Sequence, residues 1–403
     1  MNPEDLLTDA LRDRTEHTDY PSTPLATVAA RAGAIRARRR RTTVLAAAAA
    51  VALVAVPSAL WLGRSPGTSP QPATTLSSGP TTQPTAHTSP FDLGSLPKGA
   101  KPGIDYLVGD TYVTMNGDRI TDPVFRNATA ATPVRGGILV SVPPAPGMFA
   151  QDGIGSTDLV SDGRHQYLGC GSDRFAMSTD GVESAYWLAD SCPFGSGDGG
   201  ALYSGVNNTM GESGPGHVAT PAGSVYEPIG IVQQGTVVNV THGRSVHAEI
   251  VGSGSGSTIA ALSYAGGSDE NNDVVSGVLA EGSTGAVVDA ATGAVKWRAP
   301  WILGQFSNDG KYVLGYQPGD GIGTDSYAIL DATTGNKVVE LPHLGMAVSL
   351  HSLTWDFDDT VLAVASTDQD EAIVRFDQQG NLTRATPTRP VGDTYAYRLA
   401  TRP

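Results

Sequence analysis

Residues 327–339 read Tyr-Ala-Ile-Leu-Asp-Ala-Thr-Thr-Gly-Asn-Lys-Val-Val, and residues 286–297 read Ala-Val-Val-Asp-Ala-Ala-Thr-Gly-Ala-Val-Lys-Trp. Both segments consist of an apolar run, an Asp-x-x-(Thr)-Gly turn and a second apolar run. The turn aspartates, Asp289 and Asp331, are 42 residues apart, and a degenerate copy at 373–382 follows 46 residues later. Aspartate caps such a turn through its carboxylate, and glycine supplies the positive φ that a hairpin needs. The pattern therefore predicts a repeated β-hairpin.

A second motif alternates with this hairpin. The run Phe-Ser-Asn-Asp-Gly-Lys-Tyr-Val-Leu-Gly at 306–315 precedes the second hairpin copy, and a related run at 355–364 precedes the third. A unit of about 40–50 residues with four short strands is typical of a propeller blade. The region 96–403 would hold about seven such blades, and six is an alternative because 195–280 is rich in glycine and poorly patterned. We therefore predict an all-β fold, a β-propeller of about seven blades.

The N-terminal part of the chain carries a different signal. Residues 42–62, Thr-Thr-Val-Leu-Ala-Ala-Ala-Ala-Ala-Val-Ala-Leu-Val-Ala-Val-Pro-Ser-Ala-Leu-Trp-Leu, contain no charge. As a helix they would span about 31 Å, close to the hydrocarbon thickness of a bilayer. Arg36 and the arginines at 38–41 precede this span, and clustered arginines stay on the cytoplasmic side. We predict a single transmembrane helix with the N-terminus inside; cleavage as a signal peptide near 57–59 is the alternative.

The remaining segments complete the predicted organisation. Residues 1–41 are a cytoplasmic segment with short helices, either a simple tail or a docking helix for a cytoplasmic partner. Residues 63–95 are rich in Pro, Thr and Ser, a composition that cannot bury a core and predicts an extended linker. Residues 96–403 are then the extracellular domain. The protein is expected in the cell membrane as a single-pass protein.

Two resemblances extend these predictions. The run at 306–314 resembles the blade motif of TolB-like and WD40-like propellers, which implies the architecture and not the function. The whole plan also resembles actinobacterial single-pass membrane proteins with a propeller ectodomain, some of which regulate extracytoplasmic-function sigma factors. The chain departs from one large anti-sigma class because it lacks the His-x-x-x-Cys-x-x-Cys zinc element of that class.

Charge and cysteines narrow the set of partners. The formal net charge is -14; residues 1–41 carry +2, and the chain beyond residue 62 carries -16. An acidic ectodomain repels nucleic acid and anionic lipid, so neither is expected as its ligand. The two cysteines, Cys170 and Cys192, are expected to form one disulfide in an oxidising compartment. Two buried free thiols are the alternative.

No motif assigns chemistry to named residues. The chain has no Gly-x-Ser-x-Gly elbow, P-loop, dinucleotide fingerprint or His-Glu-x-x-His motif. We therefore assign no catalytic, cofactor-binding or metal-ligating residue, and expect no cofactor. His242 and His247, and the acid-rich turns at 320–325 and 368–371, are interpreted as structural rather than as metal sites. The tryptophans of the outer region are expected to pack between sheets: Trp187, Trp297, Trp301 and Trp355.

The expected function follows from propeller repeats without a catalytic motif. We expect a membrane-anchored module that binds a protein, peptide or glycan at the cell exterior, and that is not an enzyme. One alternative is a transmembrane signalling regulator whose segment 1–41 binds a transcription factor. Another is an envelope glycan-active enzyme with paired carboxylates near the propeller axis.

Overall fold

A computed structural model describes residues 91–400, apart from 135, 144–153, 180, 193, 195–197, 207–216, 253–255, 318–325, 343, 345–347 and 393–395. The predicted transmembrane helix at 42–62 lies outside the described residues, as do segments 1–41 and 63–90. In the part of the chain that is described, no helix is long and apolar enough to cross a membrane.

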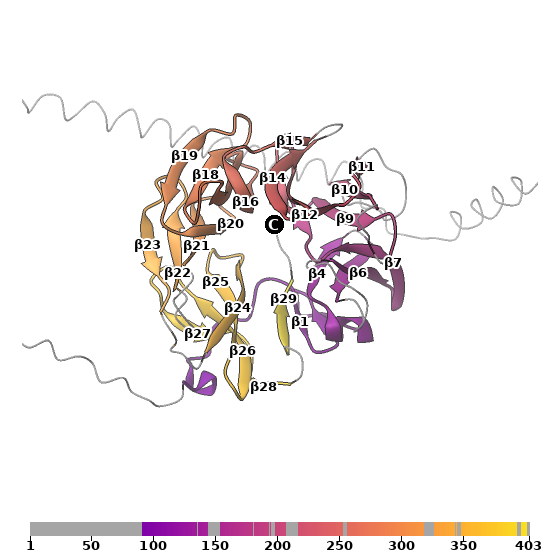
Figure 1. Ribbon diagram of the computed structural model, residues 1–403. Coiled ribbons are helices and arrows are strands. Elements are labelled where there is room, and N and C mark those ends of the chain that lie inside the picture. Colours follow the sequence, from indigo (N-terminus) through magenta and orange to yellow (C-terminus); the bar gives the residue numbers. More distant parts are fainter. Residues whose placement is uncertain are drawn as a thin grey trace, which may run out of the picture. The chain divides into compact units, whose positions relative to one another are not determined.

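The described strands form six sheets of antiparallel pairs (Figure 1). The first sheet has the order β29 (Tyr397–Leu399), β1 (Tyr106–Val108), β2 (Thr111–Val113), β3 (Arg119–Thr121). The second contains β4 (Ala130–Val134), β5 (Gly137–Val142), β6 (Ile154–Ser161), β7 (Arg164–Ser172), β9 (Glu183–Ala189), β10 (Gly200–Val206) and β11 (His217–Thr220), with β8 (Ala176–Met177) paired to β9.

The other four sheets follow the chain. The third contains β12 (Ser224–Val232), β13 (Gly235–His242), β14 (Ser245–Val251) and β15 (Gly256–Thr258). The fourth contains β16 (Leu262–Asp269), β17 (Val274–Leu279), β18 (Gly285–Asp289) and β19 (Val295–Ala299). The fifth contains β20 (Ile302–Phe306), β21 (Tyr312–Gln317), β22 (Ser326–Asp331) and β23 (Lys337–Glu340). The last contains β24 (Ser349–Trp355), β25 (Val361–Ser366), β26 (Asp370–Phe376) and β27 (Leu382–Arg384), with β28 (Arg389–Pro390) paired to β26.

The sheets stand around a common axis, as in a β-propeller (Figure 1). The innermost strands of neighbouring sheets contact each other in turn: β12 with β16, β16 with β20, β20 with β24, β24 with β29, and β29 with β4. The last strand, β29, pairs with the first strand, β1, so that Leu107 lies opposite Arg398. The two ends of the described chain therefore build one sheet together. This arrangement confirms the predicted all-β propeller.

The predicted number of blades needs correction. Within the described residues, five sheets have four or five strands and form separate blades, and the second sheet has eight strands. Its two arms, β4–β7 and β8–β11, are joined where Gly171 of β7 pairs with Leu188 of β9. The sequence predicts about seven separate units because it shows hairpin periodicity and not whether neighbouring hairpins pair with each other.

The predicted hairpin turns are confirmed in detail. The Asp331 carboxylate accepts hydrogen bonds from the backbone N–H groups of Thr333 and Thr334, and Gly335 has a φ of 74°. The Asp289 carboxylate accepts in the same way from Thr292. The Asp377 carboxylate of the third copy accepts from the backbone N–H groups of Gln379 and Asn381. The three turns connect β18 to β19, β22 to β23 and β26 to β27. The repeat read from the sequence is thus the outer hairpin of three successive sheets.

Apolar side chains fill the spaces between sheets. Trp187, Trp301 and Trp355 are buried, and Trp297 is partly buried. The indole nitrogen of Trp355 donates to the Gln305 carbonyl of the preceding sheet, over 3.0 Å. Such a ring contributes apolar packing and satisfies its N–H at the same time. Packing between sheets is the role that the sequence predicts for these residues.

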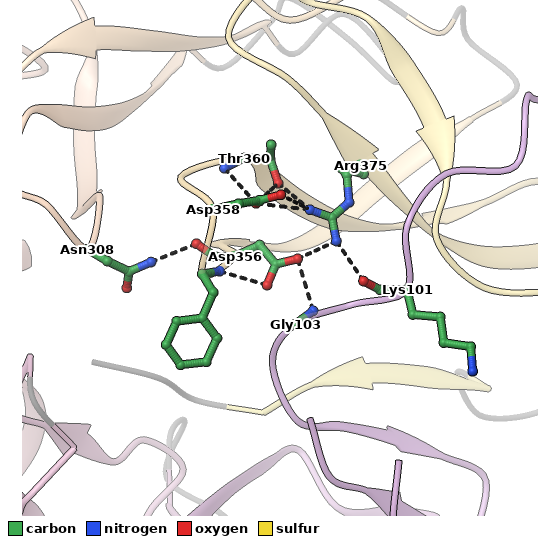
Figure 2. Close-up of polar contacts among 8 residues, drawn as sticks. Lys101, Gly103, Asn308, Asp356, Asp358, Thr360 and Arg375 are labelled. Atoms are coloured by element: carbon green, nitrogen blue, oxygen red, sulfur yellow. Dashed lines mark hydrogen bonds and ion pairs between the residues drawn. The ribbon is translucent and has the colours of Figure 1, made fainter. Parts of the chain in front are cut away.

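The segment before β1 is tied to the last sheet by a buried arginine (Figure 2). Arg375 of β26 donates to the Asp356 carboxylate over 2.5 Å, to Asp358 over 2.9 Å and to the Lys101 carbonyl over 2.8 Å. Asp356 also accepts from the Gly103 backbone N–H over 3.0 Å. The side chains of Arg375 and Asp356 are only 9% and 1% exposed. This network therefore fixes the segment before β1 to the last sheet, next to the point where that segment enters the first sheet.

The predicted disulfide between Cys170 and Cys192 is present. Cys170 lies in β7, and Cys192 follows β9 by three residues. The bond therefore crosses the joint between the two arms of the eight-stranded sheet. The joint itself has a single β7–β9 residue pair, Gly171 with Leu188. The disulfide adds a covalent link at the point where backbone pairing is sparse.

Candidate functional site

Three polar side chains from three neighbouring sheets contact one another. Arg174 follows β7, Glu227 lies in β12, and Tyr264 lies in β16. The Arg174 Nε lies 2.5 Å from Glu227 Oε1. The Tyr264 hydroxyl donates to the same oxygen over 3.3 Å. We call Arg174, Glu227 and Tyr264, together with the adjacent Asp173, the inner-strand cluster.

Local structure fixes each member of the cluster. The Ser172 hydroxyl accepts from the Arg174 backbone N–H over 3.1 Å and holds the turn that follows β7. A register shift between Pro228 and Gly230 follows Glu227 directly. Another shift, between Leu262 and Tyr264, precedes the tyrosine. β-Bulges redirect side chains and often occur next to functional sites. Glu227 and Tyr264 therefore each lie at or next to a strand irregularity.

The groups around Arg174 favour its charged form. Burial opposes the charge of Arg174, yet Glu227, Tyr264 and Asp173 together raise its pKa, so it stays cationic. Its side chain is nevertheless 54% exposed. Burial also raises the pKa of Asp173, and Arg174 partly offsets this.

The arrangement presents hydrogen-bond donors beside carboxylates. A guanidinium carries five N–H donors in a fixed fork. The Arg174–Glu227 pair uses the Nε side, so Glu227 sets the orientation of the fork. Tyr264, in β16, donates a hydrogen bond to Glu227 and holds it in place. The cluster can therefore recognise a polar ligand with little rearrangement.

The residues singled out from the sequence lie elsewhere. The ring of His242 is hydrogen-bonded to the Ser224 hydroxyl over 3.0 Å, and His247 pairs with Glu249 over 2.8 Å, so each histidine has its own partner. Glu371 accepts from the backbone N–H groups of Ala396 and Tyr397 and holds the closing strand. The turn at 320–325 lies outside the described residues. Among the residues described, no group of three His, Cys, Asp or Glu side chains forms a candidate metal site.

Sequence reasoning missed the inner-strand cluster because its members come from three sheets. Arg174 and Glu227 are 53 positions apart in the numbering, and no short motif contains them both. One signal was present. Pro228 and Gly230 lie close together in a segment rich in β-branched and aromatic residues, and these two residue types inside a strand mark bulges. That signal indicates an irregular strand next to Glu227 but not its partners.

Comparison with known proteins adds fold information only. No protein-family profile matches the chain. No curated protein is significantly similar to it in sequence. Similar solved structures include a prolyl endopeptidase, with 10% identity and a TM-score of 0.49, covering 71% of this chain and 47% of that one. Another is the dihydro-heme d1 dehydrogenase NirN in complex with DHE, with 12% identity and a TM-score of 0.42, covering 76% of this chain and 77% of that one. A third is KlHsv2 with loop 6CD replaced by a Gly-Ser linker, with 8% identity and a TM-score of 0.37, covering 61% of this chain and 76% of that one.

These neighbours correct one prediction from the sequence. We expected that the chain is not an enzyme, yet two of these three similar structures are an endopeptidase and a dehydrogenase. At such low identity the likeness concerns the fold, and neither activity transfers to this chain. The absence of familiar motifs therefore does not support the conclusion that the chain lacks an enzymatic activity.

Proposed function

We propose that this protein is a membrane-anchored, extracytoplasmic β-propeller that binds a ligand from the cell exterior at the inner-strand cluster. The observation that carries the proposal is the contact of Arg174, Glu227 and Tyr264, which come from three neighbouring sheets. Arg174 follows β7, and Glu227 and Tyr264 lie in β12 and β16, so the site depends on the packing of three sheets against one another. The ligand classes in question are a protein, a peptide or a glycan.

The location outside the cytoplasm has support of its own. The disulfide between Cys170 and Cys192 is the kind of bond that persists in oxidising compartments. The uncharged span at 42–62 and the arginines before it favour a single-pass anchor with the N-terminus inside. We also propose that the eight-stranded sheet counts as two blades, which gives a seven-bladed ring of the TolB-like or WD40-like kind. The actinobacterial single-pass plan is proposed on the same grounds.

The binding proposal predicts a loss of affinity in two variants. The full chain in nanodiscs is applied to an array of peptides and glycans. We expect Arg174→Met and Glu227→Gln to weaken the retained ligands by about tenfold or more, since a charge-assisted hydrogen bond contributes about 1.5–3 kcal/mol. The matched control is Arg298→Met, which breaks a remote exposed pair with Glu281. Retention that is equal in the wild type and Arg174→Met would refute the proposal, as would an array without any bound ligand.

The membrane topology predicts which positions are reachable from outside. Single cysteines replace Ser22, before the span, or Ser65, after it. The native thiols are joined to each other, so only the introduced thiol should react. In intact cells, a membrane-impermeant maleimide should label Ser65→Cys and should label Ser22→Cys only after permeabilisation. Labelling of Ser22→Cys in intact cells would contradict the orientation, and release of the chain into the medium would indicate cleavage.

A further inference from the structure

The inner-strand cluster leaves one edge of its guanidinium available. Among the described contacts, the Arg174 side chain pairs with Glu227 through Nε. Its two terminal nitrogens form a second edge, from which one N–H of each nitrogen points in parallel. Such an edge fits a carboxylate through two charge-assisted hydrogen bonds. Because the pairing with Glu227 already fixes the plane of the group, a ligand carboxylate would meet an oriented fork.

A ligand that carries only a negative charge is a poor match for the acidic side chains beside Arg174. Arg174 is flanked by two acidic side chains, Asp173 and Glu227, so the cluster has one positive and two negative groups when all are ionised. The chain beyond residue 62 carries a net charge of -16. A simple carboxylate would be repelled at long range. A ligand that also carries a cation avoids this repulsion and can pair with the acidic side chains.

We infer that the inner-strand cluster binds a zwitterion of the α-amino acid type, with its carboxylate on the Arg174 fork and its ammonium beside Glu227 and Asp173. The inference rests on the proposed function, because it names the ligand class for the same site. Tyr264, in β16, supports the arrangement because its hydroxyl donates to Glu227 and holds that side chain in place. The site then recognises a free amino acid, or a larger molecule that displays a free α-amino acid group. A neutral glycan has neither charge and does not fit this description.

The test uses probes that remove one charge at a time. Free amino acids are titrated calorimetrically into the full chain in nanodiscs, and the tightest is compared with its N-acetyl derivative and its amide. The N-acetyl derivative lacks the ammonium, and the amide lacks the carboxylate. We expect each derivative to bind at least tenfold more weakly. Arg174→Met should abolish the preference for the free acid over the amide, and Arg174→Lys should restore it only in part because lysine lacks the parallel donors.

The outcomes separate this inference from the proposed function. If array ligands depend on Arg174 but no free amino acid displaces them, the inferred ligand class is wrong and the proposed binding site is retained. Amino acids that bind equally well to Arg174→Met and wild type would also overturn it. If neither array ligands nor amino acids depend on Arg174, both proposals fail. Arg298→Met serves again as the control, because its exposed pair with Glu281 lies outside the inner-strand cluster.

Discussion

Replacing Arg375 with methionine should lower the free energy of unfolding by about 3–5 kcal/mol, the usual effect of breaking a buried ion pair. Methionine keeps much of the apolar stem but leaves the Asp356 carboxylate, which is 1% exposed, without its cation. The change also removes the donor to the Lys101 carbonyl, so the segment that enters β1 loses its link to β26. Chemical denaturation, followed by tryptophan fluorescence, measures the loss.

Two further variants test whether this loss of stability comes from the buried, unpaired Asp356 carboxylate. Arg298→Met breaks a pair with Glu281 whose side chains are 56% and 68% exposed, and it should cost less than about 1 kcal/mol. Adding Asp356→Leu to Arg375→Met should recover part of the stability, since no isolated buried charge remains. An Arg375→Met protein that unfolds within about 1 kcal/mol of the wild type would show that the network is not needed to hold the last sheet to the first.

Removing the disulfide by Cys170→Ala and Cys192→Ala should lower the free energy of unfolding by about 2–4 kcal/mol, the typical contribution of such a bond. The cysteines are 22 positions apart, so the bond closes a moderate loop. It also spans the joint where β7 and β9 share one residue pair. Alanine is preferred over serine because it adds no hydroxyl beside the buried Cys170. Denaturation of the double variant against the wild type gives the difference.

Reduction provides the internal control for this prediction. Wild-type protein treated with a reductant should lose about as much stability as the double variant. The double variant itself should not respond to the reductant. Equal midpoints for oxidised and reduced wild type would mean that backbone pairing and packing alone hold the two arms together.

Local chemistry explains what could be predicted from the sequence. The turn at Asp331 and Gly335 needs one carboxylate and one positive φ, and both are encoded within five residues. Repetition of this turn was enough to predict short antiparallel strands and a propeller. The pairing of Gly171 with Leu188 depends on how two hairpins meet in space. No local pattern carries that information, which is why the blade count differed.

The inner-strand cluster was out of reach for the same reason. Its ion pair joins Arg174, in the turn after β7, to Glu227 in β12 of the next sheet. The sequence shows many acidic residues and does not distinguish the one beside an arginine. The disulfide could be predicted because the chain has only two cysteines, so one pairing was the simplest choice. A contact can be predicted from this sequence when its residues have few possible partners, as the two cysteines do, and not when they have many, as Arg174 does.

The closing strand β29 has a consequence for the order in which the domain can be completed. Arg398 of this strand donates to the carbonyls of Gly109 and Phe125, and Glu371 accepts from the backbone N–H of Tyr397. Because a chain is synthesised from its N-terminus, the edge of β1 that pairs with β29 has no partner until the last strand has been made. Unpaired edges are where strands from other molecules add. Truncation before β29 would therefore leave β1 with an open edge to which a strand of another molecule can add.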